Sequence, residues 1–150
     1  MSSNHDISKL DDLIDTTIDS VRGYEQAAEH ADAGRYATFF AEMASERLSV
    51  IEALSAESRR LGGTPAEYGS AAATIHRRWE DLRRVLGGGD KALLAEIERG
   101  EDYLKEEFRR VVDDSRMSPE PLAVVRQCYQ SVLKGHDTAR ALHDQLQVAD

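Results

Sequence analysis

Long stretches of this sequence place an apolar residue at every third or fourth position, which is the periodicity of a helix packed along one side. The first stretch, residues 7–31, carries Leu10, Ile14, Val21 and Tyr24 on a single helical face. Only three prolines and 6% aromatic residues occur in 150 positions, a composition that favours helices over a sheet. The sequence therefore predicts an all-α protein.

Glycine runs and capping residues divide the chain into helical segments. Five segments are expected, at residues 7–31, about 34–61, 70–86, 90–113, and from 118–119 to about 146. Breaks fall at Gly62-Gly63 and at the three glycines 87–89, and Asp90 is placed to cap the segment that follows. Four long helices and a short one predict one four-helix-bundle domain over residues 1–150, with a short tail (1–6) and a crossover segment (64–86).

The charge balance restricts the classes of partner. The chain has 28 acidic and 19 basic residues and a formal charge of −9, which argues against nucleic acid as the main partner. No apolar run approaches the length needed to cross a membrane, and the first eight residues do not resemble a signal sequence. One cysteine excludes an internal disulfide framework. We therefore expect a soluble, cytoplasmic protein without nucleic-acid or membrane partners.

Ionisable residues interrupt the apolar stripe of each long helix. At 100° per residue, Glu25 falls on the inner face of the first helix and Arg47 in the middle of the second stripe, with Glu46 at its edge. Glu101 and His136 fall on the inner faces of the last two long helices. At 1.5 Å per residue, these groups reach similar heights near the middle of the bundle. Because lone buried charges are costly, they should pair or bind an ion.

Two interpretations of these inward groups remain open. In the first, Glu25 pairs with Arg47 and Glu101 accepts a hydrogen bond from His136, which gives a polar core layer that fixes helix register. In the second, Glu25, Glu46, Glu101 and His136 ligate iron, manganese or zinc. The guanidinium of Arg47 weighs against the metal because it would repel a cation.

Six short motifs also carry a family resemblance. They are Gly-Tyr-Glu-Gln-Ala-Ala-Glu at 23–29, Ser-Glu-Arg at 45–47, Arg-Arg-Leu-Gly-Gly at 59–63, His-Arg-Arg-Trp at 76–79, Arg-Gly-Glu-Asp at 99–102 and Gly-His-Asp at 135–137. With these motifs the chain resembles a ferritin-like four-helix bundle and, more narrowly, a bacterial four-helix-bundle domain family of unknown function. The resemblance covers nearly the whole chain. Some relatives are associated with bacterial stress responses, so a stress-related role is an expectation that follows from the resemblance.

The resemblance also implies a set of metal ligands. Ferritin-like proteins often hold two metals with a glutamate from each of two helices and Glu-x-x-His from each of the other two. Glu25 and Glu101 match the lone glutamates, Glu46 matches the motif glutamate of the second helix, and His136 matches the histidine of the last helix. The sequence contains no Glu-x-x-His, so one metal, a degenerate site or no metal is expected rather than a complete di-iron centre.

Three other features have simpler explanations. The basic cluster at 76–79 and 83–84 is expected to pack Trp79 on the bundle and to pair its arginines with nearby acids. Cys128 falls on an apolar helix face and is expected to be a buried small side chain. His143, one heptad after His136, is a weaker additional ligand candidate near the helix end.

A homodimer is the expected assembly, and the sequence does not identify its interface.

Overall fold

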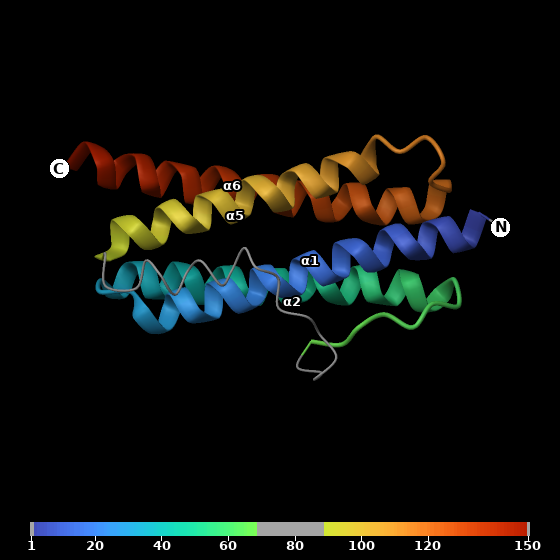
Figure 1. Cartoon of the computed structure of the whole chain (residues 1–150), viewed down its shortest axis with the longest axis horizontal. Helices are drawn as coiled ribbons and strands as arrows, with labels where there is room; N and C mark the ends of the chain where they lie inside the picture. The colour runs from blue at the N-terminus through green and yellow to red at the C-terminus, as the bar shows by residue number, and fades with distance from the viewer. Residues whose placement is uncertain (1, 69–88, 150) are drawn as a thin grey trace.

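The computed structural model describes residues 2–68 and 89–149, and these residues form four helices. They are α1 (Ser2–His30), α2 (Gly34–Arg60), α5 (Gly89–Val112) and α6 (Pro119–Ala149). No strand occurs within those two ranges. Figure 1 shows two hairpins, α1–α2 and α5–α6, stacked along their lengths. The predicted all-α four-helix class is confirmed.

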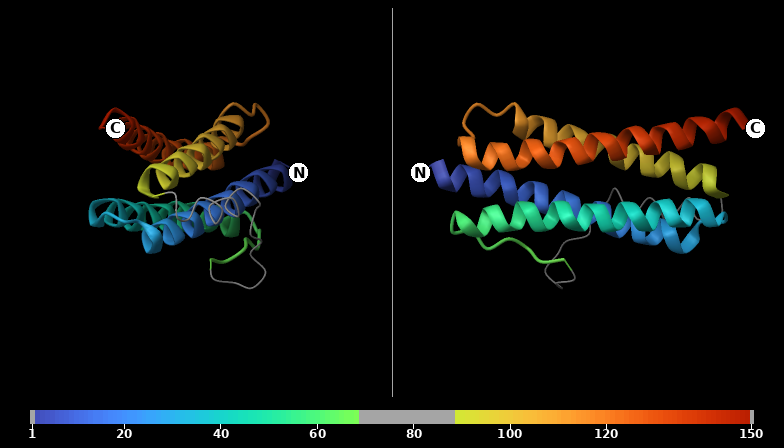
Figure 2. Two further views of the ribbon diagram at one scale, coloured as in Figure 1. Left: turned by 60° about the vertical axis from the view of Figure 1, so that its left-hand side comes forward. Right: turned by 180° about the vertical axis from the view of Figure 1, so that it is seen from behind.

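Carboxylates at the two ends of the bundle establish how the hairpins are oriented. Asp90, in the first turn of α5, accepts hydrogen bonds from the backbone N–H groups of Asp32 and Ala33 at 2.7 and 2.9 Å. Therefore α5 begins at the end where α1 turns into α2. At the opposite end, Asp6 of α1 accepts a hydrogen bond from the backbone N–H of Ser118 at 3.0 Å. Consequently α2 and α5 run in the same direction, as Figure 2 also shows.

The core is built from the apolar stripes expected from the sequence. In α5 the buried stripe contains Leu93, Ile97, Leu104, Phe108 and Val111. In α1 the buried stripe contains Leu10, Ile14, Thr17, Val21 and Tyr24. Helical periodicity brings such residues to one side, so burial of these faces joins the hairpins into one core.

The N-terminus differs from the expected short tail. The first helix begins at Ser2 rather than near residue 7, so most of the stretch 1–6 is helical. Asp6 is almost fully buried because its carboxylate binds the backbone at Ser118, where α6 begins. A contact distant in sequence therefore orders these residues, and local pattern does not reveal it.

The helix ends follow the glycine signals more closely. Leu61 caps α2, and Gly62 then adopts φ +97°, a left-handed conformation that glycine reaches without strain. The predicted cap residue Asp90 lies inside α5, and its carboxylate binds the neighbouring α1–α2 turn.

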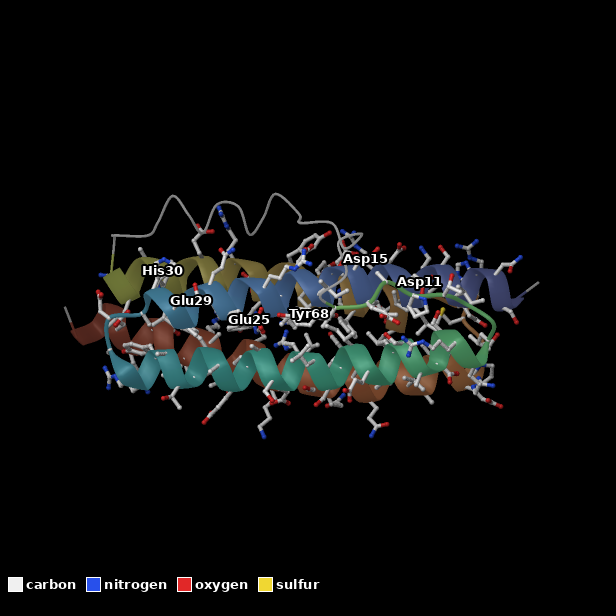
Figure 3. All side chains as sticks on the ribbon, turned by 90° about the horizontal axis from the view of Figure 1, so that it is seen from below. Asp11, Asp15, Glu25, Glu29, His30 and Tyr68 are labelled. Atoms are coloured by element: carbon white, nitrogen blue, oxygen red, sulfur yellow. The ribbon has the colours of Figure 1, made fainter. Side chains whose placement is uncertain are left out.

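The predicted short helix at 70–86 lies outside the described residues. The part of the connection that is described returns along α1, since Gly63 lies against Ile7 and the Tyr68 hydroxyl donates to Glu25. Figure 3 shows Glu25 and Tyr68 side by side.

The described helices also differ from membrane-spanning helices. None combines the length and the apolar character that crossing a lipid bilayer requires.

Candidate functional site: a buried polar layer

An arginine–glutamate pair joins the two hairpins at the centre of the bundle. Arg47 of α2 donates from Nη2 to Oε1 of Glu101 of α5 at 2.7 Å, and the two side chains are 0% and 1% exposed. Both residues stand in apolar stripes, so packing of the stripes brings them into the core. A charge in that position must be neutralised by a partner, because its desolvation costs about 5 kcal/mol.

Tyr24 of α1 completes this layer. Its ring lies 5.9 Å from the guanidinium carbon of Arg47, within range of a cation–π interaction. Burial raises the pKa of Tyr24 well above its usual value, and the nearby Glu101 carboxylate adds to the rise. Burial alone would lower the pKa of Arg47, but Glu101 and the other groups beside the guanidinium together outweigh burial, and the pKa is raised. The layer therefore holds a cationic arginine beside a neutral tyrosine.

Gly135 of α6 gives the guanidinium its space. A Cβ atom on this glycine would lie 2.5 Å from Nη2 of Arg47 and 2.5 Å from Cε of Met43. Since a Cβ atom practically never approaches a neighbour so closely, an alanine would force one of these side chains to move. All four helices thus contribute to the layer, three with a polar side chain and α6 with a glycine.

Much of the hydrogen-bonding capacity of the pair is unused. Within the described part of the chain, Nε and Nη1 of Arg47 and Oε2 of Glu101 are buried without a hydrogen-bond partner. The two nitrogens of Arg47 lose their contacts with water on folding without gaining a hydrogen bond, whereas the Glu101 carboxylate also has Tyr24 beside it. A buried ion pair with unmet hydrogen bonds contributes little net stability compared with apolar side chains of the same volume.

His136 forms a separate polar contact that reaches the surface. The histidine is 2% exposed, and its Nε2 lies 2.5 Å from Oδ1 of Asp102, whose side chain is largely exposed. The expected hydrogen bond between Glu101 and His136 is replaced by this contact. Successive helical residues point 100° apart, so Glu101 meets α2 while Asp102 meets α6.

Glu25 and Glu46 are exposed rather than inward. Glu25 accepts a hydrogen bond from the Tyr68 hydroxyl, and Glu46 accepts one from Ser131 at 2.7 Å. The expected Glu25–Arg47 pair is wrong, because the preceding residue, Tyr24, takes the inner position of α1 and turns Glu25 away from it.

The four candidate metal ligands thus have four different partners. Glu101 and His136 are buried, Glu25 and Glu46 lie on the surface, and metal ligation by the set stays a prediction. The sequence pattern did not identify Asp102 or Tyr68 as partners. The structure also buries Asp19 of α1, which the sequence pattern did not single out. A signal existed for Gly135, because a glycine inside a helix often marks close packing.

The fold and the layer together define a class: an all-α protein in which a buried ion pair joins two helical hairpins. A family model described as a domain of unknown function (DUF2383) matches residues 5–114, and the chain belongs to this family. The matched range contains Tyr24, Arg47 and Glu101 but ends before α6. A comparison with curated proteins gives no match.

Proposed function

We propose that this protein is a non-catalytic, ferritin-like structural or interaction module whose buried polar layer fixes how the two hairpins dock. The observation that carries the proposal is the fully buried contact between Arg47 and Glu101. One carboxylate oxygen of Glu101 is already bonded to Arg47, a cation of the protein itself. A metal ion bound to the same carboxylate would face the guanidinium.

The ion pair discriminates between registers of the hairpins. Sliding α5 along α2 by one helical turn would displace Glu101 by about 5.4 Å and break its 2.7 Å contact. The slid arrangement would retain most apolar contacts but would bury two uncompensated charges. Apolar stripes alone do not impose such a penalty, so the layer is suited to selecting one arrangement.

The direction of the helices supports a ferritin-like topology. Since α2 and α5 run in the same direction, the end of α2 and the start of α5 lie at opposite ends of the bundle, and Gly63 and Tyr68 lie against α1. One long crossover between two hairpins is the arrangement of ferritin-like folds. We therefore retain the single ferritin-like domain over residues 1–150 and the crossover at 64–86 as part of the proposal.

The remaining functional expectations are kept as predictions. They are a homodimer, a cytoplasmic location and a stress-related role. Sedimentation equilibrium of the full chain measures the first directly.

A double-mutant cycle tests the polar layer. Arg47→Met and Glu101→Leu should each lower the free energy of unfolding by about 3–5 kcal/mol, because each leaves a buried charge without its partner. The double variant should recover most of this loss, since it contains neither charge. Urea unfolding of the four proteins gives the coupling energy. Glu25→Gln, at an exposed glutamate, is the matched control and should change stability by less than about 0.5 kcal/mol.

Additive losses in the cycle would contradict the proposal. The same variants, analysed for bound iron, manganese and zinc after desalting, test the competing mid-bundle metal site. That site predicts that Arg47→Met binds metal as well as or better than the parent protein, and that Glu101→Leu and His136→Ala abolish binding.

A further inference from the structure

We propose that Glu98, His143 and Asp144 form a binding site on the α5–α6 hairpin for a divalent metal ion such as Zn²⁺. One ring nitrogen of His143 and one carboxylate oxygen from each of the other two residues lie within 4.8 Å of one another. Nδ1 of His143 and Oε2 of Glu98 are already 2.7 Å apart. The site is independent of the polar layer and uses none of its residues.

The chemistry of the three groups defines the ligand class. One imidazole nitrogen with two carboxylate oxygens suits Zn²⁺, Mn²⁺ or Fe²⁺ better than a cation that requires only oxygen ligands. Donor atoms around tetrahedral Zn²⁺ lie roughly 3.3 Å apart, given bond lengths of about 2.0–2.1 Å. The 2.7 Å contact between His143 and Glu98 would therefore open by about 0.6 Å, as their hydrogen bond gives way to bonds to the metal. The remaining separations would close by about 1.5 Å at most, a distance that a side-chain torsion of the exposed Asp144 can supply.

The position of the cluster favours access and rigidity. Glu98 comes from α5, and His143 and Asp144 come from α6, so a bound ion would join the two helices. The side chains of His143 and Glu98 are 13% and 24% exposed, whereas Asp144 is exposed. Two ligands are thus held by packing and the third stands on the solvent side, where an ion can enter and water can complete its coordination.

Other histidines in the structure provide an internal comparison. His5 lies 2.7 Å from Asp114 and His136 lies 2.5 Å from Asp102, so each also contacts a carboxylate. Within residues 2–68 and 89–149, only the His143 cluster brings three ligand-type atoms from three residues this close together. The third ligand distinguishes a candidate metal site from an ordinary histidine–carboxylate hydrogen bond.

Titration of the full, untagged chain with Zn²⁺ in a calorimeter tests the site. We expect one equivalent to bind and the melting temperature to rise, since an ion that binds only the folded chain stabilises it. His143→Ala and Glu98→Gln should each weaken Zn²⁺ binding by about tenfold or more. Asp144→Asn should also weaken binding, and its exposed position makes it the variant least affected by any loss of folding. His5→Ala, in the matched pair without a third ligand, should bind Zn²⁺ like the parent chain.

Two results would overturn the inference. One is a parent protein that binds no Zn²⁺. The other is Zn²⁺ binding that survives both Glu98→Gln and Asp144→Asn in variants shown to be folded by circular dichroism. Binding that is lost in His136→Ala but retained in Asp144→Asn would assign the ion to the middle of the bundle instead. The double-mutant cycle of Arg47 and Glu101 measures the coupling energy of the polar layer and does not involve the metal site, so the two proposals can fail independently.

Discussion

The middle and the ends of the bundle use the same contact distance in different surroundings. Arg47 and Glu101 meet at 2.7 Å in the core, and the backbone N–H of Asp32 meets Asp90 at 2.7 Å at an end of the bundle. The first pair is fully buried, whereas the second lies at the surface, where water can replace a lost partner. Distance alone therefore says little about what a contact is worth. The cost of breaking it depends on what replaces the partner.

Gly135→Ala sharpens this comparison without removing either charge of the buried pair. Alanine normally stabilises a helix interior by about 1 kcal/mol relative to glycine. Here the new Cβ atom would press on Arg47 and Met43, and Arg47 cannot move without weakening its contact with Glu101. We expect a net loss of about 2 kcal/mol in the free energy of unfolding, measured by urea titration.

Gly34→Ala provides the matched control for this substitution. Gly34 is the first residue of α2, and a Cβ atom there would have no heavy atom within 4 Å. Its replacement should be neutral or slightly stabilising. Equal effects at the two glycines would show that the middle of the bundle tolerates crowding as well as its end does.

Asp90→Ala tests one end of the bundle. The substitution removes two hydrogen bonds to the backbone of the α1–α2 turn, at Asp32 and Ala33. Because water can reach these N–H groups, we expect a loss of about 1 kcal/mol, similar to that of a helix cap. Asp90→Asn keeps an acceptor oxygen and should lose less. A loss as large as that of an Arg47 variant would remove the distinction between middle and ends.

The helices and the core were predictable because they depend on local periodicity. The stripe through Leu10, Ile14 and Val21 is buried as expected, and Gly62 ends α2 as its position in the sequence suggests. The start of α1 was not predictable in the same way. It depends on Asp6 meeting Ser118, a contact between residues more than 100 positions apart in the chain.

The site was predictable in its composition but not in its pairing. Sequence pattern placed Arg47, Glu101 and His136 in the core, and all three are buried. It placed Glu25 there as well. Consecutive residues of a helix point 100° apart, so the sequence pattern locates the edge of a wide apolar face only to within about one residue. The partner of a buried charge depends on how helices are rotated against one another, and a single helical wheel does not contain that information.

Acid titration tests the end where α5 leads into α6. A hydrogen bond from the backbone N–H of Arg116, together with His5 at 2.7 Å, holds the pKa of Asp114 below its usual value. The ionised form is therefore favoured in the folded state. Its contribution is present above about pH 4 and is lost as the pH falls through the lower, folded-state pKa.

Asp114→Asn should remove this contribution. We expect the variant to be less stable than the parent protein by under about 1 kcal/mol at pH 6, and the difference to shrink towards pH 2. Urea titrations across this pH range measure it. A difference that does not change with pH would mean that the charge of Asp114 has no role at this end.

The reactivity of Cys128 compares the packed interior with the ends without altering stability. Cys128 is 6% exposed, and burial raises the pKa of its thiol to about 11. At pH 8 only roughly one thiol in a thousand would then be the reactive thiolate, so labelling with a disulfide reagent should be at least about 100-fold slower in the folded protein than in urea. Ser115→Cys in a Cys128→Ser background puts the single thiol at an exposed position of the α5–α6 loop and should react at nearly the unfolded rate. Rapid labelling of Cys128 would mean that the reagent reaches the contact between α2 and α6 as readily as the α5–α6 loop. The middle of the bundle would then be no less accessible than its ends.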